Sequence, residues 1–270
     1  MRIVLLTSAQ ANQVALANKI ADEFDLIGIV VEKRKINKAK KYTFKNIISK
    51  VAHRILFRKV IQSWWNMLAF YNEKYAAFPA KKMLEVSNIN DDEVKDFIIN
   101  CKADVVMVSG TAMVRKNILL VPLPVGMINL HTGLSPYIKG GPNCTNWCIA
   151  TNQFHLIGNT IMWIDAGIDS GDILTTATVQ FTGKETLTAI HIRVMEEAHA
   201  LYIKALHAIK NNTAKRIKQD SIIKGTTYYT KDWNFKTNKN LLKNLKHFNE
   251  QINSDLYKDK LGETIIISVE

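Results

Sequence analysis

Three polar side chains in one stretch of the sequence could together carry out acyl transfer to an amine. Asn129 and His131 lie two residues apart near the end of a predicted strand, so their side chains point to the same side. Asp169 follows in the glycine-containing turn Gly167–Gly171. An amide can stabilise a tetrahedral oxyanion, an imidazole can take or relay the amine proton, and a carboxylate can orient the imidazole. Standing alone, each of these features is more often structural.

The elements that would position these residues alternate between strand and helix. Apolar runs predict buried strands, and stretches with helical spacing lie between them. This alternation predicts an α/β fold, a Rossmann-like, doubly wound and mostly parallel sheet with a short C-terminal appendage. Because ligands bind at the carboxyl edge of such sheets, we expect Asn129 and His131 to face a ligand site. The predicted strands are 2–7, 26–31, 84–87, 104–109, 126–130, 155–164 and 172–181, and the predicted helices are 12–24, 91–101, 143–151 and 185–210.

One predicted helix start has the sequence of a capping box. Asn90 stands at the N-cap position and Glu93 follows three residues later. We therefore expect the side chain of Asn90 to cap the helix that begins at Asp91.

The order of motifs from Met127 to Leu174 resembles the formyltransferase family. The family pattern is Asn-x-His-Pro-Ser-Leu-Leu-Pro, a glycine-containing loop, a Gly-x-Thr strand and an Asp-x-Gly-x-Ile/Leu element. The chain has these four parts in the same order, with Thr132-Gly133 in place of Pro-Ser and Ser135 in place of a leucine. They are Asn129 to Pro136, Gly140-Gly141, Gly158-Asn159-Thr160 and Asp169 to Leu174.

This resemblance implies a formyltransferase that uses 10-formyltetrahydrofolate as its formyl donor, with no metal. It also implies that Asn129, His131 and Asp169 are the catalytic triad. The pterin would be held largely by backbone groups of two loops, which by position contain Met113, Val114, Arg115, Asp165, Ala166 and Ile168.

Three classes of amine acceptor are compatible with the family. Glycinamide ribonucleotide needs a phosphate cradle, but the loop Ser8–Gln13 after the first strand contains no glycine. Initiator tRNA is used by members with a full C-terminal β-barrel, for which the tail is short. A nucleotide-linked amino sugar, a precursor of a surface glycan such as O-antigen, fits better. We expect its binding residues to be Ser8, Gln10, Tyr137, Gly140 and Gly141, with the tail 225–229 completing the pocket.

The alternatives stay open at this point. They are a methionyl-tRNA formyltransferase, a phosphoribosylglycinamide formyltransferase, and a non-catalytic protein that binds folate or a nucleotide sugar.

Composition indicates a folded chain with one large domain. With 270 residues, 47% of them hydrophobic, the chain can bury a full core. We expect a catalytic domain at residues 1–210, in which residues 33–83 form a basic, aromatic-rich helical insertion. After residue 211 the composition turns to Lys, Asn, Thr and Tyr, which predicts a tail or small subdomain at 211–270.

The net charge of +12 is concentrated in one segment. Residues 33–60 contain eleven Lys or Arg and no Asp or Glu, with apolar residues roughly on one helical face from Phe44 to Val60. We favour a solvated insertion whose apolar side packs on the sheet or on a second subunit, while contact with anionic lipid is the alternative. Trp64 and Trp65 are expected to be core or dimer contacts, and a homodimer is expected. A nucleic-acid partner would leave the 127–174 string unexplained.

The three cysteines indicate reduced thiols in a cytoplasmic protein, because no stretch resembles a secretion signal or a membrane span. Cys144, Cys148 and His155 have poor spacing for a metal site, so the cysteines are expected to be packing thiols on a helix.

Overall fold

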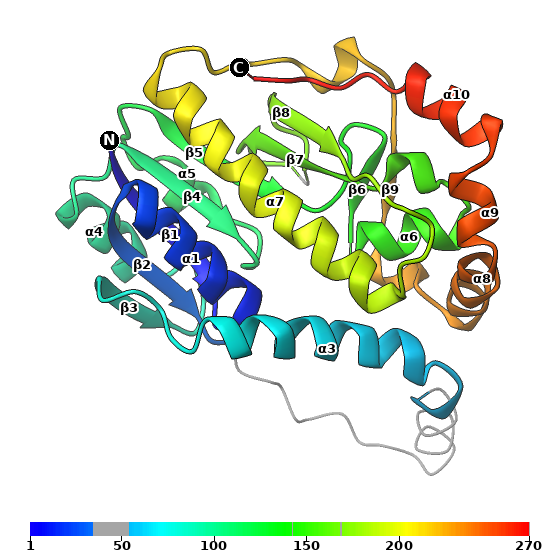
Figure 1. Cartoon of the computed structure of the whole chain (residues 1–270). Helices are drawn as coiled ribbons and strands as arrows, with labels where there is room; N and C mark the ends of the chain where they lie inside the picture. Colours follow the sequence, from blue (N-terminus) through cyan, green and yellow to red (C-terminus); the bar gives the residue numbers. More distant parts are fainter. Residues whose placement is uncertain (35–53, 142, 168, 270) are drawn as a thin grey trace.

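A computed structural model describes residues 1–34, 54–141, 143–167 and 169–269 of the chain. Its centre is a seven-stranded sheet in the order β3-β2-β1-β4-β5-β7-β8 (Figure 1). The strands are β1 (Arg2–Ser8), β2 (Asp25–Glu32), β3 (Lys82–Val86), β4 (Val105–Ser109), β5 (Gly126–His131), β7 (Gly158–Trp163) and β8 (Ile173–Thr178).

The first five strands in the sheet order run parallel to one another, and β7 runs in the opposite direction between β5 and β8. β1 pairs in parallel with β2 and β4, whereas β7 pairs antiparallel with both β5 and β8. The strand order reverses at β1, which places a crevice beyond the carboxyl ends of β1 and β4. The predicted doubly wound, mostly parallel sheet is confirmed.

Helices cover both faces of the sheet. α1 (Ala11–Glu23), α3 (Arg58–Lys74) and α7 (Leu187–Lys210) lie on one face, and α4 (Asp92–Asn100) and α5 (Lys116–Leu119) lie on the other (Figure 1). Successive residues of a strand point to opposite faces, so Ile3 and Leu5 of β1 pack under α1 and α7, while Val4 and Leu6 pack under α4. Both faces are therefore buried, which explains the continuous apolar runs in the sequence.

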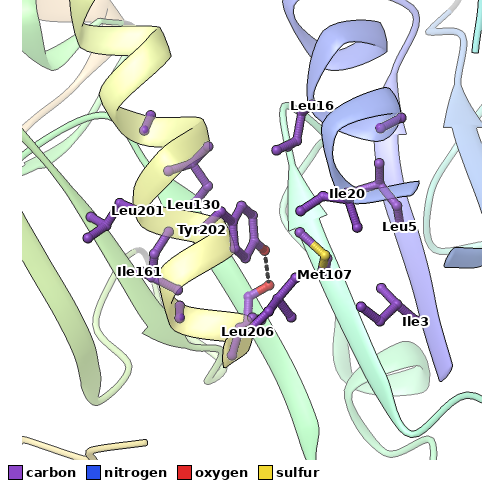
Figure 2. Close-up of a cluster of buried hydrophobic side chains, with 14 of the residues drawn as sticks. Ile3, Leu5, Leu16, Ile20, Met107, Leu130, Ile161, Leu201, Tyr202 and Leu206 are labelled. Carbon is purple, nitrogen blue, oxygen red and sulfur yellow. Dashed lines mark hydrogen bonds between the residues drawn. The ribbon is translucent and has the colours of Figure 1, made fainter. Parts of the chain in front are cut away.

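Tyr202 of α7 ties two central strands together. Its side chain is fully buried in the cluster that Figure 2 shows, between residues of α1, β4 and α7. The hydroxyl donates to the carbonyl of Ile128 in β5 at 2.8 Å and accepts the N–H of Val108 in β4 at 3.1 Å. The helix thus contacts the backbone of both strands near the edge where ligands bind.

The C-terminal residues pack beside the carboxyl edge of the sheet. β6 (Ile138–Gly140) pairs in parallel with β9 (Thr226–Tyr228), and α6 (Cys144–Ala150) packs against α8 (Phe235–Lys246) through residues such as Cys148 and Leu241. α9 (Phe248–Ile252) and α10 (Asp255–Glu263) follow, and short 3₁₀ helices lie at η1 (Phe154–Leu156), η2 (Gln219–Ser221) and η3 (Thr230–Asp232). The boundary at residue 211 stays a prediction.

Two local expectations need correction. The helix after Asn90 takes Asp91 as its N-cap, without a side-chain hydrogen bond, so the predicted capping box is wrong. Asn90 instead binds the 113–117 loop, because its amide reaches backbone groups there. The strand predicted at 155–164 starts later, because residues 154–156 form a 3₁₀ helix.

Residues 35–53 of the basic segment lie outside the described residues, and with them most of its predicted apolar face. Val60 is buried, but Ile55 is 69% exposed, so these two do not share a buried face. Within 33–83, α3 is the crossover helix between β2 and β3 and packs against α1 and α7. Trp64 contacts the ring of His191, whereas Trp65 is exposed.

Candidate active site

A cleft opens at the carboxyl ends of β4 and β5. It has a volume of about 200 Å³ and combines apolar walls with polar side chains. Asn129 and Asp169 both line it, so the structure brings an amide and a carboxylate to one cavity. The apolar walls include Val108, Met162 and Trp163. Two loops form the remainder, through residues 110–114 and through residues 164, 165, 167 and 169–171.

His131 lies directly behind the carboxylate. Its Nδ1 is 3.3 Å from Oδ2 of Asp169, and its Nε2 is 3.2 Å from the carbonyl oxygen of Ile138. The thiol of Cys144 lies 3.5 Å from the same Nε2. Only 8% of His131 is exposed, and it is not among the residues that line the cleft. Asp169 therefore lies between the imidazole and the cleft.

The surroundings of His131 favour its charged form. Burial lowers the pKa of the imidazole, but the charge of Asp169 and the neighbouring Cys144 raise it, and the resulting pKa is about 10. Both ring nitrogens face acceptors, which suits a ring that carries two N–H donors. At neutral pH the imidazole of His131 is then charged.

Asp169 is held in an uncommon backbone conformation. Its φ is +47°, a left-handed value that side-chain-bearing residues adopt at a cost. The N–H of Gly140 donates to Oδ2 of Asp169 at 3.0 Å. Gly140 itself has φ +84°, and a Cβ there would overlap the carbonyl oxygen of Tyr228 in β9, so only glycine fits this close approach.

The 110–117 loop is braced from two elements. Glu32, at the buried end of β2, accepts the N–H of Ala112 at 2.7 Å and that of Ile89 at 3.1 Å. Asn90 donates to the carbonyl of Met113 and accepts the N–H of Arg115. These contacts hold the backbone of the loop in place. Between them, the N–H of Val114 has no partner among the described residues.

The residues expected to grip the pterin fall into different places. Met113, Val114 and Asp165 line the cleft, whereas Arg115 does not and is exposed at the start of α5. Ala166 lines a neighbouring cavity. Ile168 lies outside the described residues.

The residues expected to bind the acceptor lie around the cleft without lining it. Ser8 ends β1, and its hydroxyl is buried without a partner in the described part of the chain. Gln10 is exposed at the start of α1. The Tyr137 hydroxyl accepts the N–H of Ile265, and Gly141 donates its N–H to the carbonyl of Tyr228. Their role in binding stays a prediction.

Three residues near the site were not predicted to act there. The sequence predicts Cys144 to be a packing thiol, and no local signal in the sequence indicates its contact with His131. Gly133 stands out in the sequence only as a departure from the family pattern, yet a Cβ there would overlap Nε2 of His131. Gln219 lies in the lysine-rich tail and binds the loop that carries Asp169.

Metal and membrane features can be stated for the described residues only. Within them no group of three or more His, Cys, Asp or Glu is arranged to hold a metal ion. Cys144 and Cys148 are buried free thiols on α6. None of the helices in the described ranges has the length and apolarity needed to cross a bilayer.

Comparison with known proteins gives one family match and several relatives. A family model described as "Formyl transferase" matches residues 1–206. The methionyl-tRNA formyltransferase of Desulforamulus reducens is 28% identical over 138 residues, which are 51% of this chain and 43% of the relative. That of Clostridium perfringens strain SM101 is 31% identical over 132 residues, 48% of this chain and 42% of the relative. The match thus spans less than half the length of these relatives.

Solved structures share the fold at low sequence identity. A 4-N formyltransferase from Francisella tularensis has a TM-score of 0.56 and 19% identity, covering 90% of this chain and 87% of that one. An N-formyltransferase from Helicobacter canadensis, in complex with folinic acid and dTDP-3-aminofucose, has a TM-score of 0.55 and 14% identity, covering 90% and 80%. A glycinamide ribonucleotide transformylase from Symbiobacterium toebii has a TM-score of 0.54 and 14% identity, covering 81% and 94%.

Proposed function

The chain belongs to the formyl transferase family, and from that premise we propose that it moves a formyl group from 10-formyltetrahydrofolate to the amine of a nucleotide-linked amino sugar. The observation that carries this proposal is the arrangement at the cleft. Asn129 and Asp169 line one cavity, and His131 lies 3.3 Å behind the carboxylate. An amide and a carboxylate in one cavity, with an imidazole directly behind the carboxylate, are groups that can carry out acyl transfer to an amine.

The cleft fits a flat heterocycle with polar edges. Val108, Met162 and Trp163 provide apolar surface, and the N–H groups of Val114 and Asp165 have no partner among the described residues, so both are free to bind a ligand. Met113, Val114, Arg115, Asp165, Ala166 and Ile168 remain the proposed folate-binding residues. When bound, 10-formyltetrahydrofolate supplies the formyl carbon that the amine attacks.

We assign the chemistry to three side chains. The Asn129 amide donates a hydrogen bond to the formyl oxygen as that oxygen becomes negatively charged. Asp169 receives the proton that the amine releases, because it is the member of the pair that lines the cleft. His131 stands behind it as a cation that orients the carboxylate, since both ring nitrogens are engaged. The carbon–nitrogen bond to the donor breaks as that nitrogen takes up the proton that Asp169 received from the amine, which leaves Asp169 as it was at the start.

Residues at the edge of the site support the proposal that the acceptor is an amino sugar. The tail adds β9 to β6, and Tyr228 there contacts the backbone of Gly140 and Gly141 next to Asp169. A short tail therefore contributes one side of the region where we propose the acceptor binds. Several solved neighbours are sugar N-formyltransferases, one of them in complex with a dTDP-linked amino sugar. Ser8 and Gln10 lie at the adjacent strand end.

Initiator tRNA is the second candidate acceptor, because the curated relatives that match are methionyl-tRNA formyltransferases. The match covers less than half the length of those relatives, so it leaves the acceptor of this chain open.

A panel assay separates the candidates. The purified protein is incubated with 10-formyltetrahydrofolate and dTDP-, UDP- and GDP-linked amino sugars, and formylated products are measured by mass spectrometry. Methionyl-tRNA and glycinamide ribonucleotide are run in parallel, with His131→Asn as the inactive control. We expect turnover with a nucleotide sugar. Turnover with methionyl-tRNA and with no sugar would assign the protein to the second candidate.

A further inference from the structure

We propose that Gln219 is a positioning residue that holds the Asp169 loop in register with His131, which rests on the proposed function of the same site. Gln219 lies in η2, 50 residues beyond Asp169 and outside the region that the family model matches. It touches neither the cleft nor His131, so it acts on the reaction only through the loop.

The side chain of Gln219 binds the Asp169 loop through its amide nitrogen. Its Nε2 donates to the carbonyl of Asp169 at 2.8 Å and to the carbonyl of Gly171 at 2.8 Å. Only 4% of Gln219 is exposed, so both bonds are made away from water, where they are worth more. In the described part of the chain these two carbonyls have no other partner.

Backbone pairing sets this geometry. Ile217 and Ile173 exchange two backbone hydrogen bonds, of 3.0 and 2.8 Å, in an antiparallel bridge. Gln219 follows Ile217 by two residues, at the start of η2, and Gly171 precedes Ile173 by two residues, so this bridge brings Gln219 close to the loop. The bridge to the start of β8 therefore holds the backbone of Gln219 next to the loop that its side chain binds.

The loop needs such a clamp at Asp169. A left-handed aspartate persists only where its surroundings hold it, and Asp169 has φ +47°. Asp165 holds the first half of the loop, because its Oδ1 accepts from Gly167 N at 2.9 Å and Ser170 Oγ at 2.7 Å. The carbonyl of Asp169 itself is held from the other side by Gln219.

The other end of the Gln219 amide supports a local role. Its Oε1 is buried without a partner among the described residues, and an unsatisfied buried acceptor costs stability. Loss of the amide therefore removes this cost together with the two bonds. We expect replacement of Gln219 to disturb the site more than it disturbs the stability of the fold.

Gln219→Met keeps the length of the side chain and removes the donor. Asn244→Leu is the matched control, because Asn244 makes the same kind of clamp, at 2.8 Å to the carbonyl of Ile149 and 3.2 Å to that of Ala150, at the end of α6. We measure kcat and KM with the best acceptor of the panel, the melting temperature, and the pKa of His131 by NMR of ¹³C-labelled histidine. The groups that face His131 are Asp169 and Cys144.

In Gln219→Met we expect kcat to fall on the order of 10- to 100-fold, because a displacement of about 1 Å at a reacting group has effects of this size. KM should change little, and the His131 pKa should fall towards its ordinary value as Asp169 moves away. Asn244→Leu should lower the melting temperature and leave kcat and the His131 pKa as in the wild type.

The proposal would be overturned if Gln219→Met kept the wild-type kcat and the wild-type titration of His131. It would also be overturned if Gln219→Met and Asn244→Leu changed kcat and the His131 pKa in the same way. The NMR titration needs no acceptor. If the wild type formylates no amine in the panel, a lowered His131 pKa in Gln219→Met still supports the clamp, while the proposed function alone fails.

Discussion

Substitution of Gly133 by alanine should displace the imidazole of His131 from its present position beside Asp169. Gly133 lies two residues beyond His131, and its backbone is not in the left-handed region, so space is the only obstacle to a side chain. An added Cβ would overlap Nε2 of His131 and would lie 2.9 Å from Cβ of Cys144. Cys144 and the carbonyl of Ile138 already contact that nitrogen, so the ring has to move as a whole.

The size of the effect follows from this overlap. To restore ordinary van der Waals contact the imidazole has to recede by about 1 Å. The contact of its Nδ1 with Asp169 spans 3.3 Å, and a displacement of that size breaks or misaligns it. We therefore expect kcat to fall about 100-fold, or about 2.7 kcal/mol in the activation free energy.

The assay is steady-state formylation followed by mass spectrometry, with the melting temperature and far-UV circular dichroism as checks on folding. Gly262→Ala is the matched control, because a Cβ at Gly262 in α10 meets nothing within 4 Å. It should leave kcat unchanged and stabilise the helix by at most about 1 kcal/mol. A folded Gly133→Ala protein with wild-type kcat would refute the placement of His131 in the mechanism.

Three further predictions concern the amide and the buried histidines. Asn129→Ala should lower kcat by about 100- to 1,000-fold with little change in KM, and an effect on KM alone in steady-state kinetics would contradict an oxyanion role. Because the folded pKa of His131 is raised to about 10, the stability from its pair with Asp169 is fully present below about pH 6.5 and lost as the pH rises through 10. Urea unfolding from pH 6 to 10 should show this loss in the wild type, and the same slope in Asp169→Asn would disprove it. Burial, with a smaller effect from the charge of Lys19, lowers the pKa of His199 to about 3. The folded protein therefore loses stability as the pH falls below about 6.5, because the unfolded chain binds a proton at His199 that the folded chain does not. Near pH 5 this amounts to about 2 kcal/mol, which urea unfolding should detect in the wild type but not in His199→Leu.

The fold was predictable because its signals are local. Strands buried on both faces read as continuous apolar runs, and the runs at 2–7, 26–31 and 104–109 correspond to β1, β2 and β4. The N-cap of α4 was not predictable in the same way. Asn90 has the residue type for a cap, but its amide makes long-range hydrogen bonds to the loop around Met113, which no short pattern reveals.

The site was predictable in part for the same reason. Asn129 and His131 share one strand, so their relation follows from its two-residue repeat, and Asp169 was found through the order of the family motifs. The contacts of Cys144 and Gln219 depend on how distant segments meet in the fold. Gln219 stands among Lys, Asp and Ser in the tail, without spacing that would set it apart.

The hydroxyl of Tyr202 adds a side-chain link between the neighbouring strands β4 and β5. Val108 and Asn129, which both line the cleft, are register partners on the two strands that this oxygen bridges. The same helix packs its N-terminal half against α6 through Asn146 and His191. One helix therefore contacts both the two strands whose ends line the cleft and the helix α6 that carries Cys144, next to His131.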